Sequence, residues 1–341
     1  MARRSPRAIA ITLVQYAVAI GALYWLLTQI DLGAVWSLLG RLDPATVLAL
    51  LGVTVVGLLG RFDTYYVLID RLGPTRFRDA ARVDLVVNFV NQLLPSRLSG
   101  RVAAPFVIRS FTGMTLPDAT AVAALHTAMF ALCYALVAAV GLAVALPRLS
   151  VGIALLLALS IGLYLLAGLA VLFGGANLTA FDRLLAVLRR LFARLPVVGD
   201  AVADRMEGLV GFTAESTATF RELLVLARVW VRYAAGWAIK HVLASGVRVW
   251  LLFGAFGASV EPAIALPLYL VAAYSVTLLP VTPGGIGITE ATATVVFVAL
   301  GVPGEVAASA ILLDRVLGVY LPALAGWYPS LSLGRPESAA S

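Results

Sequence analysis

Two prolines, three glycines and one carboxylate fall within the apolar stretch from Leu279 to Glu290, which includes Pro283, Gly284 and Gly285. Prolines remove backbone donors and glycines loosen the backbone, so an α-helix can hardly continue through this stretch. Each unpaired backbone group in hydrocarbon costs several kcal/mol, and irregular backbone survives at membrane depth only where it is buried in protein or lines a polar cavity. The stretch therefore predicts a functional site rather than a lipid-facing surface.

Glu290 has two interpretations. It follows Gly287 and Thr289 where a short helix should begin, and the positive end of the helix dipole favours a carboxylate there. Alternatively, Glu290 lines a cavity that the break opens and meets a cationic group, either an arginine of another helix or a substrate amine. The sequence leaves both interpretations open.

A second break lies earlier in the chain, between residues 88 and 101. Pro95 is followed by Gly100 there, much as Pro280 is followed by Gly284, and an ionisable residue comes next in both places. Paired breaks in the two halves of a hydrophobic chain indicate the midplane binding site of a transporter. The polar side chains that we expect at this break are those of Asn88, Asn91 and Gln92.

Arg97, Arg101 and Arg109 follow the second break at multiples of four residues, so on a helix they share one face. A guanidinium group offers forked donors to phosphate oxygens, which makes such a face suitable for phosphate recognition. The alternative is that these arginines only determine membrane topology from the cytoplasmic side.

A second group of cations, Arg232, Lys240 and Arg248, is also spaced at multiples of four, within one predicted helix. Lys240 lies near the middle of the membrane, where a charge costs at least about 2.5 kcal/mol, so it should face a partner or a wet cavity. Its candidate partners are Glu290, Asp314 and a bound anionic lipid.

Asp314 and Arg315 are adjacent in the last long predicted helix. Neighbouring residues on a helix point about 100° apart, so these two cannot pair well with each other, and each must find a partner elsewhere in the bundle. They either bind substrate or form a structural pair between helices. His126 has no carboxylate or cysteine at ligand spacing and is expected to be a buried polar residue.

The elements that must hold these residues are membrane-spanning helices. Of the 341 residues, 61% are hydrophobic and 13% charged, and the mean hydropathy is +0.98, far outside the usual range of soluble domains. Apolar blocks of about 20 residues cross about 30 Å of hydrocarbon as helices. The sequence predicts an all-α polytopic bundle with about 7–8 spanning helices and two broken or re-entrant segments. We place the spans at 8–30, 44–69, 117–146, 150–173, 229–256, 263–280 and 305–328, and the short segments at 83–96 and 286–300.

One integral membrane domain is expected over residues 1–330, with a cytoplasmic amphipathic insertion at about 176–227 and a disordered tail at 331–341. In the insertion, arginines alternate with leucines at helical spacing. It either lies on the inner membrane surface or caps the bundle as a helical hairpin.

Basic residues indicate the orientation. Arginines precede the first predicted helix, follow the second from Arg61 to Arg82 and fill the connection 183–228, whereas the opposite loops hold Arg41 and Arg148. The positive-inside rule then puts the N-terminus in the cytoplasm, and we expect a multi-pass protein of the cell membrane. The basic start has no small-residue cleavage pattern, so we interpret it as a transmembrane helix rather than a signal peptide.

These motifs resemble the transmembrane region of the lysylphosphatidylglycerol synthase family, the flippase-like domain of multiple peptide resistance factors. The likeness covers most of the chain and rests on the Asn, Leu-Pro, Gly pattern of 91–101, the Pro-x-Thr-Pro-Gly-Gly-x-Gly-x-x-Glu motif ending at Glu290, and Arg315. The resemblance implies a domain that moves an aminoacylated phospholipid between leaflets while a separate soluble domain makes it. The few residues after the last predicted helix leave no room for that domain, so we expect no aminoacyl transfer by this chain.

Our leading hypothesis is a non-enzymatic translocase for an anionic or aminoacylated phospholipid or a similar amphiphile. Arg97, Arg101 and Lys240 would hold the phosphate, Glu290 would meet a cationic group, and the amides at the early break would replace headgroup hydration. One alternative is an integral membrane lipid transferase, although the sequence contains no Asp-rich metal pattern and no Ser-His-Asp arrangement. Another is a non-catalytic partner of a glycosyltransferase or lipid-modifying enzyme.

The partners expected from this hypothesis are membrane lipids with anionic headgroups. A separately encoded lipid synthase or glycosyltransferase and a second copy of the chain are further partners that the sequence allows, whereas nucleic acid is not expected. We also expect no cofactor and no metal; Cys133 is the single cysteine of the chain, so cysteine metal sites and internal disulfides are excluded.

Overall fold

The computed structural model describes residues 40, 42–93, 97–177, 199–278 and 286–333, and every regular element in these ranges is a helix. The predicted helix 8–30 and the tail from 334 lie outside the described residues. Within them, the all-α fold class is confirmed.

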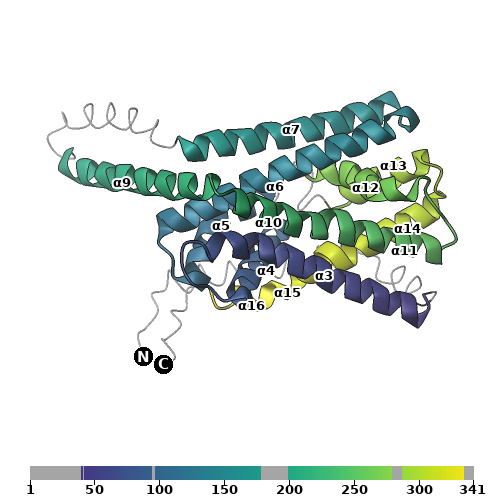
Figure 1. Cartoon of the computed structure of the whole chain (residues 1–341), viewed down its shortest axis with the longest axis horizontal. Helices are drawn as coiled ribbons and strands as arrows, with labels where there is room; N and C mark the ends of the chain where they lie inside the picture. Colours follow the sequence, from purple (N-terminus) through teal and green to yellow (C-terminus); the bar gives the residue numbers. More distant parts are fainter. Residues whose placement is uncertain (1–39, 41, 94–96, 178–198, 279–285, 334–341) are drawn as a thin grey trace.

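Five helical segments are long and apolar enough to cross a membrane. Their lengths, from 26 to 33 residues, correspond to about 39–50 Å at 1.5 Å per residue, more than the hydrocarbon core requires. In Figure 1 they run roughly side by side along the long axis of the bundle. They are α3 (Pro44–Ile69), α6 (Leu116–Ala145) with η1 (Leu146–Arg148), α7 (Val151–Ala176), α10–η2–α11 (Ala227–Ala238, Ile239–Ala244, Ser245–Ala255) and α14–η6–α15–α16 (Gly304–Arg315, Val316–Tyr320, Leu321–Ala325, Trp327–Ser330).

Three of these helices begin at a residue whose side chain caps the first turn. The Asp43 carboxylate accepts a hydrogen bond from the Thr46 amide (3.0 Å) at the start of α3. Thr115 accepts from the Asp118 amide at the start of α6, and Ser150 caps α7 in the same way. These caps satisfy amides that have no partner within the helix, and they therefore fix where each helix starts. The starts predicted from the sequence agree with the observed ones to within one residue.

Short helices flank both predicted breaks. The pair α4 (Phe77–Leu93) and α5 (Arg97–Thr112) borders residues 94–96, and α12 (Leu266–Tyr274) with η4 (Ser275–Leu278) and α13 (Ile288–Ala299) borders 279–285. The helices of each pair pack against each other, and Figure 1 places the two pairs toward opposite ends of the bundle. The residues of the breaks themselves, including Pro283, Gly284 and Gly285, lie outside the described part.

The predicted spanning helix over 263–280 is helical from 263 to 278 but consists of three pieces, and residues 279 and 280 lie outside the described part. A 3-10 turn, η3 (Ala263–Ala265), precedes α12, which has nine residues, and the 3-10 turn η4 follows it. Pro267 occupies the first turn of α12, where its missing amide is tolerated, so the α-helix starts there and not earlier. The α-helical part of this segment is one of the shorter apolar helices and is not among the five segments described above.

Glycines bring α3 close to the helix that carries Lys240. A Cβ built on Gly236 of α10 would lie 2.6 Å from the carbonyl oxygen of Gly60, and one built on Gly57 would lie 2.7 Å from the Cβ of Ala244. Small residues at such crossings allow close backbone approach between membrane helices. The approach places Arg61 and Lys240, which follow these glycines, at the same level of the bundle.

Two of the long helices contain a π-helical segment, which the sequence did not predict. These are η2 (Ile239–Ala244) and η6 (Val316–Tyr320), and the Lys240 ammonium of η2 donates to the Gly318 carbonyl oxygen of η6 (2.8 Å). Single π turns within α-helices occur often at functional sites, because they change the direction of side chains. Here they face each other across the centre of the bundle.

Part of the predicted insertion 176–227 forms a long helix, α9 (Gly199–Leu224), and residues 178–198 lie outside the described part. Figure 1 shows α9 extending beyond the end of the bundle beside α7. It is held to α6 because Thr219 donates to the Asp118 carboxylate (2.7 Å), and to α7 because Arg221 donates to the Ala176 carbonyl oxygen (2.6 Å).

A charged cavity as the candidate functional site

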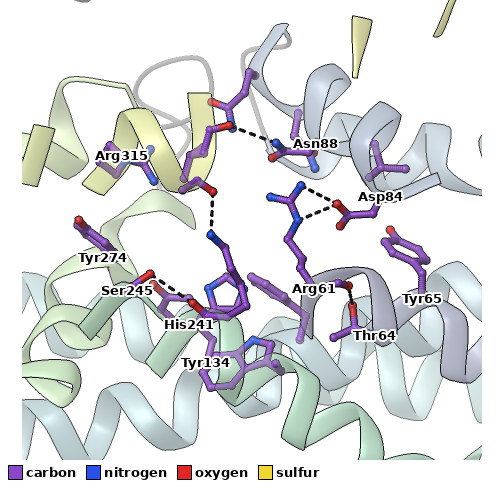
Figure 2. A pocket seen from close by; sticks show the side chains of 18 of the residues that line it. Arg61, Thr64, Tyr65, Asp84, Asn88, Tyr134, His241, Ser245, Tyr274 and Arg315 are labelled. Atoms are coloured by element: carbon purple, nitrogen blue, oxygen red, sulfur yellow. Dashed lines mark hydrogen bonds and ion pairs between the residues drawn. The ribbon is translucent and has the colours of Figure 1, made fainter. Parts of the chain in front are cut away.

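A cavity of about 130 Å³ lies where α3, α4, α6, η2, α11 and the α14–η6 segment meet. Figure 2 shows Arg61 and Asp84 at one side of this cavity and Arg315 and Tyr274 at the other. Its volume is several times the space that one water molecule needs. The ionisable and amide side chains that line it are those of Arg61, Tyr65, Asp84, Asn88, Asn91, Gln92, His126, Tyr134, Lys240, His241, Arg248, Tyr274, Asp314 and Arg315.

Arg61 forms an ion pair with Asp84 of α4. Its Nε donates to the Asp84 carboxylate at 2.7 Å, and its Nη2 lies 2.6 Å from the same oxygen. The expectation that Arg61 follows the second helix and marks its cytoplasmic end is wrong. Arg61 lies eight residues before the end of α3, about 12 Å along the helix axis, and points into the cavity.

Asp314 pairs with Arg248 and not with its neighbour Arg315, as the helix geometry predicts. Arg248 Nε and Nη2 lie 2.8 and 2.6 Å from one carboxylate oxygen, and the Tyr274 hydroxyl donates to the other at 2.8 Å. Arg248 Nη2 also donates to the Ser245 hydroxyl (3.1 Å). The side chains of Arg248 and Asp314 are 0% and 2% exposed, so this pair is fully desolvated.

Arg315 pairs with Glu290, which answers the question of the glutamate's partner. Arg315 Nε donates to the Glu290 carboxylate at 2.7 Å, and the Tyr320 hydroxyl donates to the same oxygen. The other carboxylate oxygen accepts from the Gly287 amide (2.7 Å) at the start of α13. Glu290 therefore stabilises a helix start and also pairs with an arginine of another helix, as parts of both interpretations have it. It is not among the residues that line the cavity.

Lys240 pairs with neither of its two candidate carboxylates. Its side chain is buried, and the hydrogen bond that the structure gives its ammonium goes to the Gly318 carbonyl oxygen. Among the described residues, no carboxylate oxygen lies within 4.0 Å of it. Asp314 and Glu290 are each held by an arginine instead; the third candidate, a bound anionic lipid, stays a prediction.

Several buried polar atoms at the cavity have no hydrogen-bond partner within the described structure. An unpaired buried polar group costs about 1–3 kcal/mol, so native proteins seldom keep one without a ligand or water to satisfy it. Here donors and acceptors both occur. They are Arg248 Nη1, Arg315 Nη2, Trp237 Nε1 and Arg61 Nη2 as donors, the last of them in the ion pair with Asp84, and Asn91 Oδ1 and Gln92 Oε1 as acceptors.

Aromatic rings of α3, α6 and α10 form one wall of the cavity. The ring of His126 stacks on that of Tyr65 at a centroid distance of 3.9 Å, and His241 stacks on Trp237 at 5.1 Å. His126, expected to be a buried polar residue, is half-buried and lies at the cavity.

Six of the predicted site residues line this cavity. A seventh, Glu290, does not line it but is ion-paired with Arg315, which does. The six are Asn88, Asn91, Gln92, Lys240, Asp314 and Arg315. Arg97 and Arg101 lie in the first turns of α5, and their side chains are outside the described part. Arg109, near the end of α5, is exposed. Whether any of these residues binds a substrate stays a prediction.

Arg232 does not share a face with Lys240. It pairs with Asp63 of α3 at 2.5 Å, and its side chain is 48% exposed. A separation of eight residues leaves a rotation of about 80° on an α-helix, so spacing in multiples of four does not keep a common face over two turns or more.

Sequence reasoning left Arg61, Asp84, Arg248, Tyr274 and Trp237 out of the predicted site. Arg61 and Arg248 carry a usable signal, because each is an ionisable residue inside a predicted spanning helix, and such residues usually face the bundle interior. Asp84 carries no such signal, since α4 is rich in polar residues. Within the described residues, no three His, Cys, Asp or Glu side chains gather as metal ligands.

The fold and the cavity define a polytopic α-helical membrane protein with ionisable groups buried at the centre of its bundle. The chain belongs to the family described as the lysylphosphatidylglycerol synthase TM region, whose model matches residues 12–326.

Two curated relatives are both UPF0104 membrane proteins. The one from Methanothermobacter thermautotrophicus is 28% identical over 141 residues, which is 39% of each chain. The one from Pyrococcus horikoshii is 28% identical over 152 residues, covering 44% of this chain and 43% of the relative. The chain thus spans about two fifths of the length of each relative. No solved structure matches it.

Proposed function

We propose that this protein moves a lipid or a lipid-linked headgroup between the leaflets of the cell membrane, without converting it chemically. The polar headgroup would cross through the central cavity while the acyl chains stay in the bilayer. Membership of a family named for a lipid synthase supports a lipid ligand, and the stretches bordered by short helices are typical of transporter sites.

The observation that carries this proposal is the set of buried cations around a cavity with unpartnered donors. A charge at the centre of a membrane helix costs at least about 2.5 kcal/mol, and such residues usually mark a substrate or ion path. Structural ion pairs would explain Arg61 and Arg248. They do not explain Lys240, whose ammonium contacts a backbone carbonyl, or the free Nη atoms of Arg248 and Arg315.

Each group has a role in this proposal. Lys240, Arg248 and Arg315 hold the phosphate, because charged donors bind phosphate oxygens strongly. Asn91 and Gln92 replace part of the hydration of the headgroup. Arg97 and Arg101, just after the early break, would receive the phosphate on its way in or out.

Reconstitution into liposomes with a fluorescent phospholipid tests the proposal. A membrane-impermeant reductant bleaches only the outer leaflet, so a translocase raises the bleached fraction above one half. We expect bleaching with the wild type and a loss of at least tenfold in rate with Lys240→Gln, which removes a charge without breaking an ion pair. Arg232→Gln is the matched control, because it removes a charge from the same helix outside the cavity.

Two outcomes would contradict the proposal. One is that the wild type moves no lipid of any headgroup class. The other is that Lys240→Gln moves lipid as fast as the wild type does.

We further propose that the Arg-rich connection after α3 faces the cytoplasm. Impermeant thiol reagents should label Arg148→Cys from outside intact cells and should leave Arg78→Cys unlabelled, both in a Cys133→Ser background. The reverse labelling would contradict this orientation.

A further inference from the structure

The charges around the cavity do not cancel. Three arginines each pair with a carboxylate: Arg61 with Asp84, Arg248 with Asp314, and Arg315 with Glu290. Lys240 is the fourth cation that lines the cavity, and its bond goes to an uncharged carbonyl oxygen. Among the described residues of the site, Lys240 is therefore the basic side chain without a carboxylate partner.

That unmatched charge lies close to a second cation. A Cβ built on Gly318 would lie 3.2 Å from Lys240 Nζ and 2.5 Å from Arg248 Nη2, so both cationic groups flank the same glycine. Like charges held together away from water disfavour each other's charged form unless an anion lies between them. The free Nη1 of Arg248 and the indole N–H of Trp237 add donors to this side of the cavity.

Most carboxylate oxygens at or near the cavity are already engaged. Both oxygens of Asp314 and both oxygens of Glu290 accept hydrogen bonds, whereas Asp84 receives both contacts of Arg61 on one oxygen, Oδ2. A headgroup amine would have to leave water and compete with the arginines for these carboxylates, which is costly. The free acceptors are the uncharged amide oxygens of Asn91 and Gln92, which suit hydroxyl groups.

We infer that the cavity selects amphiphiles whose headgroup is a phosphodiester with one net negative charge and hydroxyl groups, and that it rejects zwitterionic and aminoacylated headgroups. The phosphate lies between Lys240 and the free donors of Arg248 and Trp237, and the hydroxyl groups face the amides of α4. This inference concerns the same cavity as the proposed translocase and rests on that function for its biological role.

The test is a competition experiment on the purified full-length protein in detergent micelles. A fluorescent short-chain phosphatidylglycerol is the reporter, and the competitors are short-chain phosphatidylglycerol, phosphatidylethanolamine and lysyl-phosphatidylglycerol, with net charges of −1, 0 and +1, together with inorganic phosphate. We expect phosphatidylglycerol to compete at least tenfold better than phosphatidylethanolamine and lysyl-phosphatidylglycerol to compete least. Lys240→Gln should weaken phosphatidylglycerol at least tenfold and bring it level with phosphatidylethanolamine, whereas Arg232→Gln should keep the wild-type order.

The inference is overturned if the three lipids compete equally well for the wild-type protein, or if the lysyl lipid competes best. If inorganic phosphate competes as well as phosphatidylglycerol, the site takes a free anion and the lipid assignment is overturned. A thermal unfolding curve for each variant separates loss of binding from loss of fold.

The two proposals fail in different ways. Transport of all headgroups at one rate would contradict the charge selection and leave the translocase in place. Selective binding without transport of any lipid would contradict the translocase and leave the binding site in place.

Discussion

Replacing Asp314 by asparagine removes the carboxylate that holds Arg248 at the centre of the bundle. The carboxylate lies 2.8 and 2.6 Å from two guanidinium nitrogens and accepts from the Tyr274 hydroxyl, and asparagine of the same shape would leave a fully buried guanidinium without a negative partner. Breaking a buried ion pair at one partner costs about 3–5 kcal/mol. A loss of 3 kcal/mol lowers the equilibrium constant for folding about a hundredfold.

Reversible unfolding in mixed micelles, followed by tryptophan fluorescence, measures this loss. Asp63→Asn is the control, because it breaks the Arg232 pair, whose side chains are 48% and 23% exposed, and exposed pairs contribute about 0–1 kcal/mol. The double variant Arg248→Met, Asp314→Leu should recover most of the stability, since apolar residues of similar volume often replace a buried pair without loss. Asp314→Asn within 1 kcal/mol of the wild type would refute a desolvated pair at this position.

Two further predictions concern the helices that position the cavity. Gly236→Ala should cost about 1–3 kcal/mol of unfolding free energy, because the new methyl group meets the backbone of Gly60 at 2.6 Å and cannot be accommodated by a side-chain shift. The control Gly254→Ala, whose methyl group meets nothing within 4 Å, should show no loss. Equal effects of the two substitutions would contradict the close crossing of α3 and α10. The hydroxyl and the amide of Thr46 donate to the Asp43 carboxylate and hold its pKa below the ordinary value. The cap is therefore complete at neutral pH and is lost as pH falls below about 4. Hydrogen exchange of the Thr46 amide should report this loss as a fall in its protection factor. A protection factor that is unchanged down to pH 2 would contradict the cap.

Local signals predicted most of the helices. The span 44–69 coincides with α3 (Pro44–Ile69), because a capping aspartate and a first-turn proline precede an apolar run and act within a few residues of one another. The π-helical segments η2 and η6 were not predictable in this way. Their turns follow from packing between helices, where Lys240 reaches a carbonyl oxygen 78 residues later. The sequence of η2 contains no glycine or proline that would mark it, and the single Gly318 of η6 does not differ from glycines that lie within regular α-helices.

The sequence by itself determined that the chain is an α-helical membrane protein and that it carries costly charges inside its spans, since apolar length and composition suffice for both conclusions. It also determined that Asp314 and Arg315 need separate partners. Only the tertiary structure decided which residues those partners are. Asp314 pairs with Arg248, 66 residues earlier, and Arg315 pairs with Glu290, 25 residues earlier. Helix crossings bring together residues that are distant in sequence, and the same crossings leave Lys240 as the cation of the cavity without a carboxylate among the described residues.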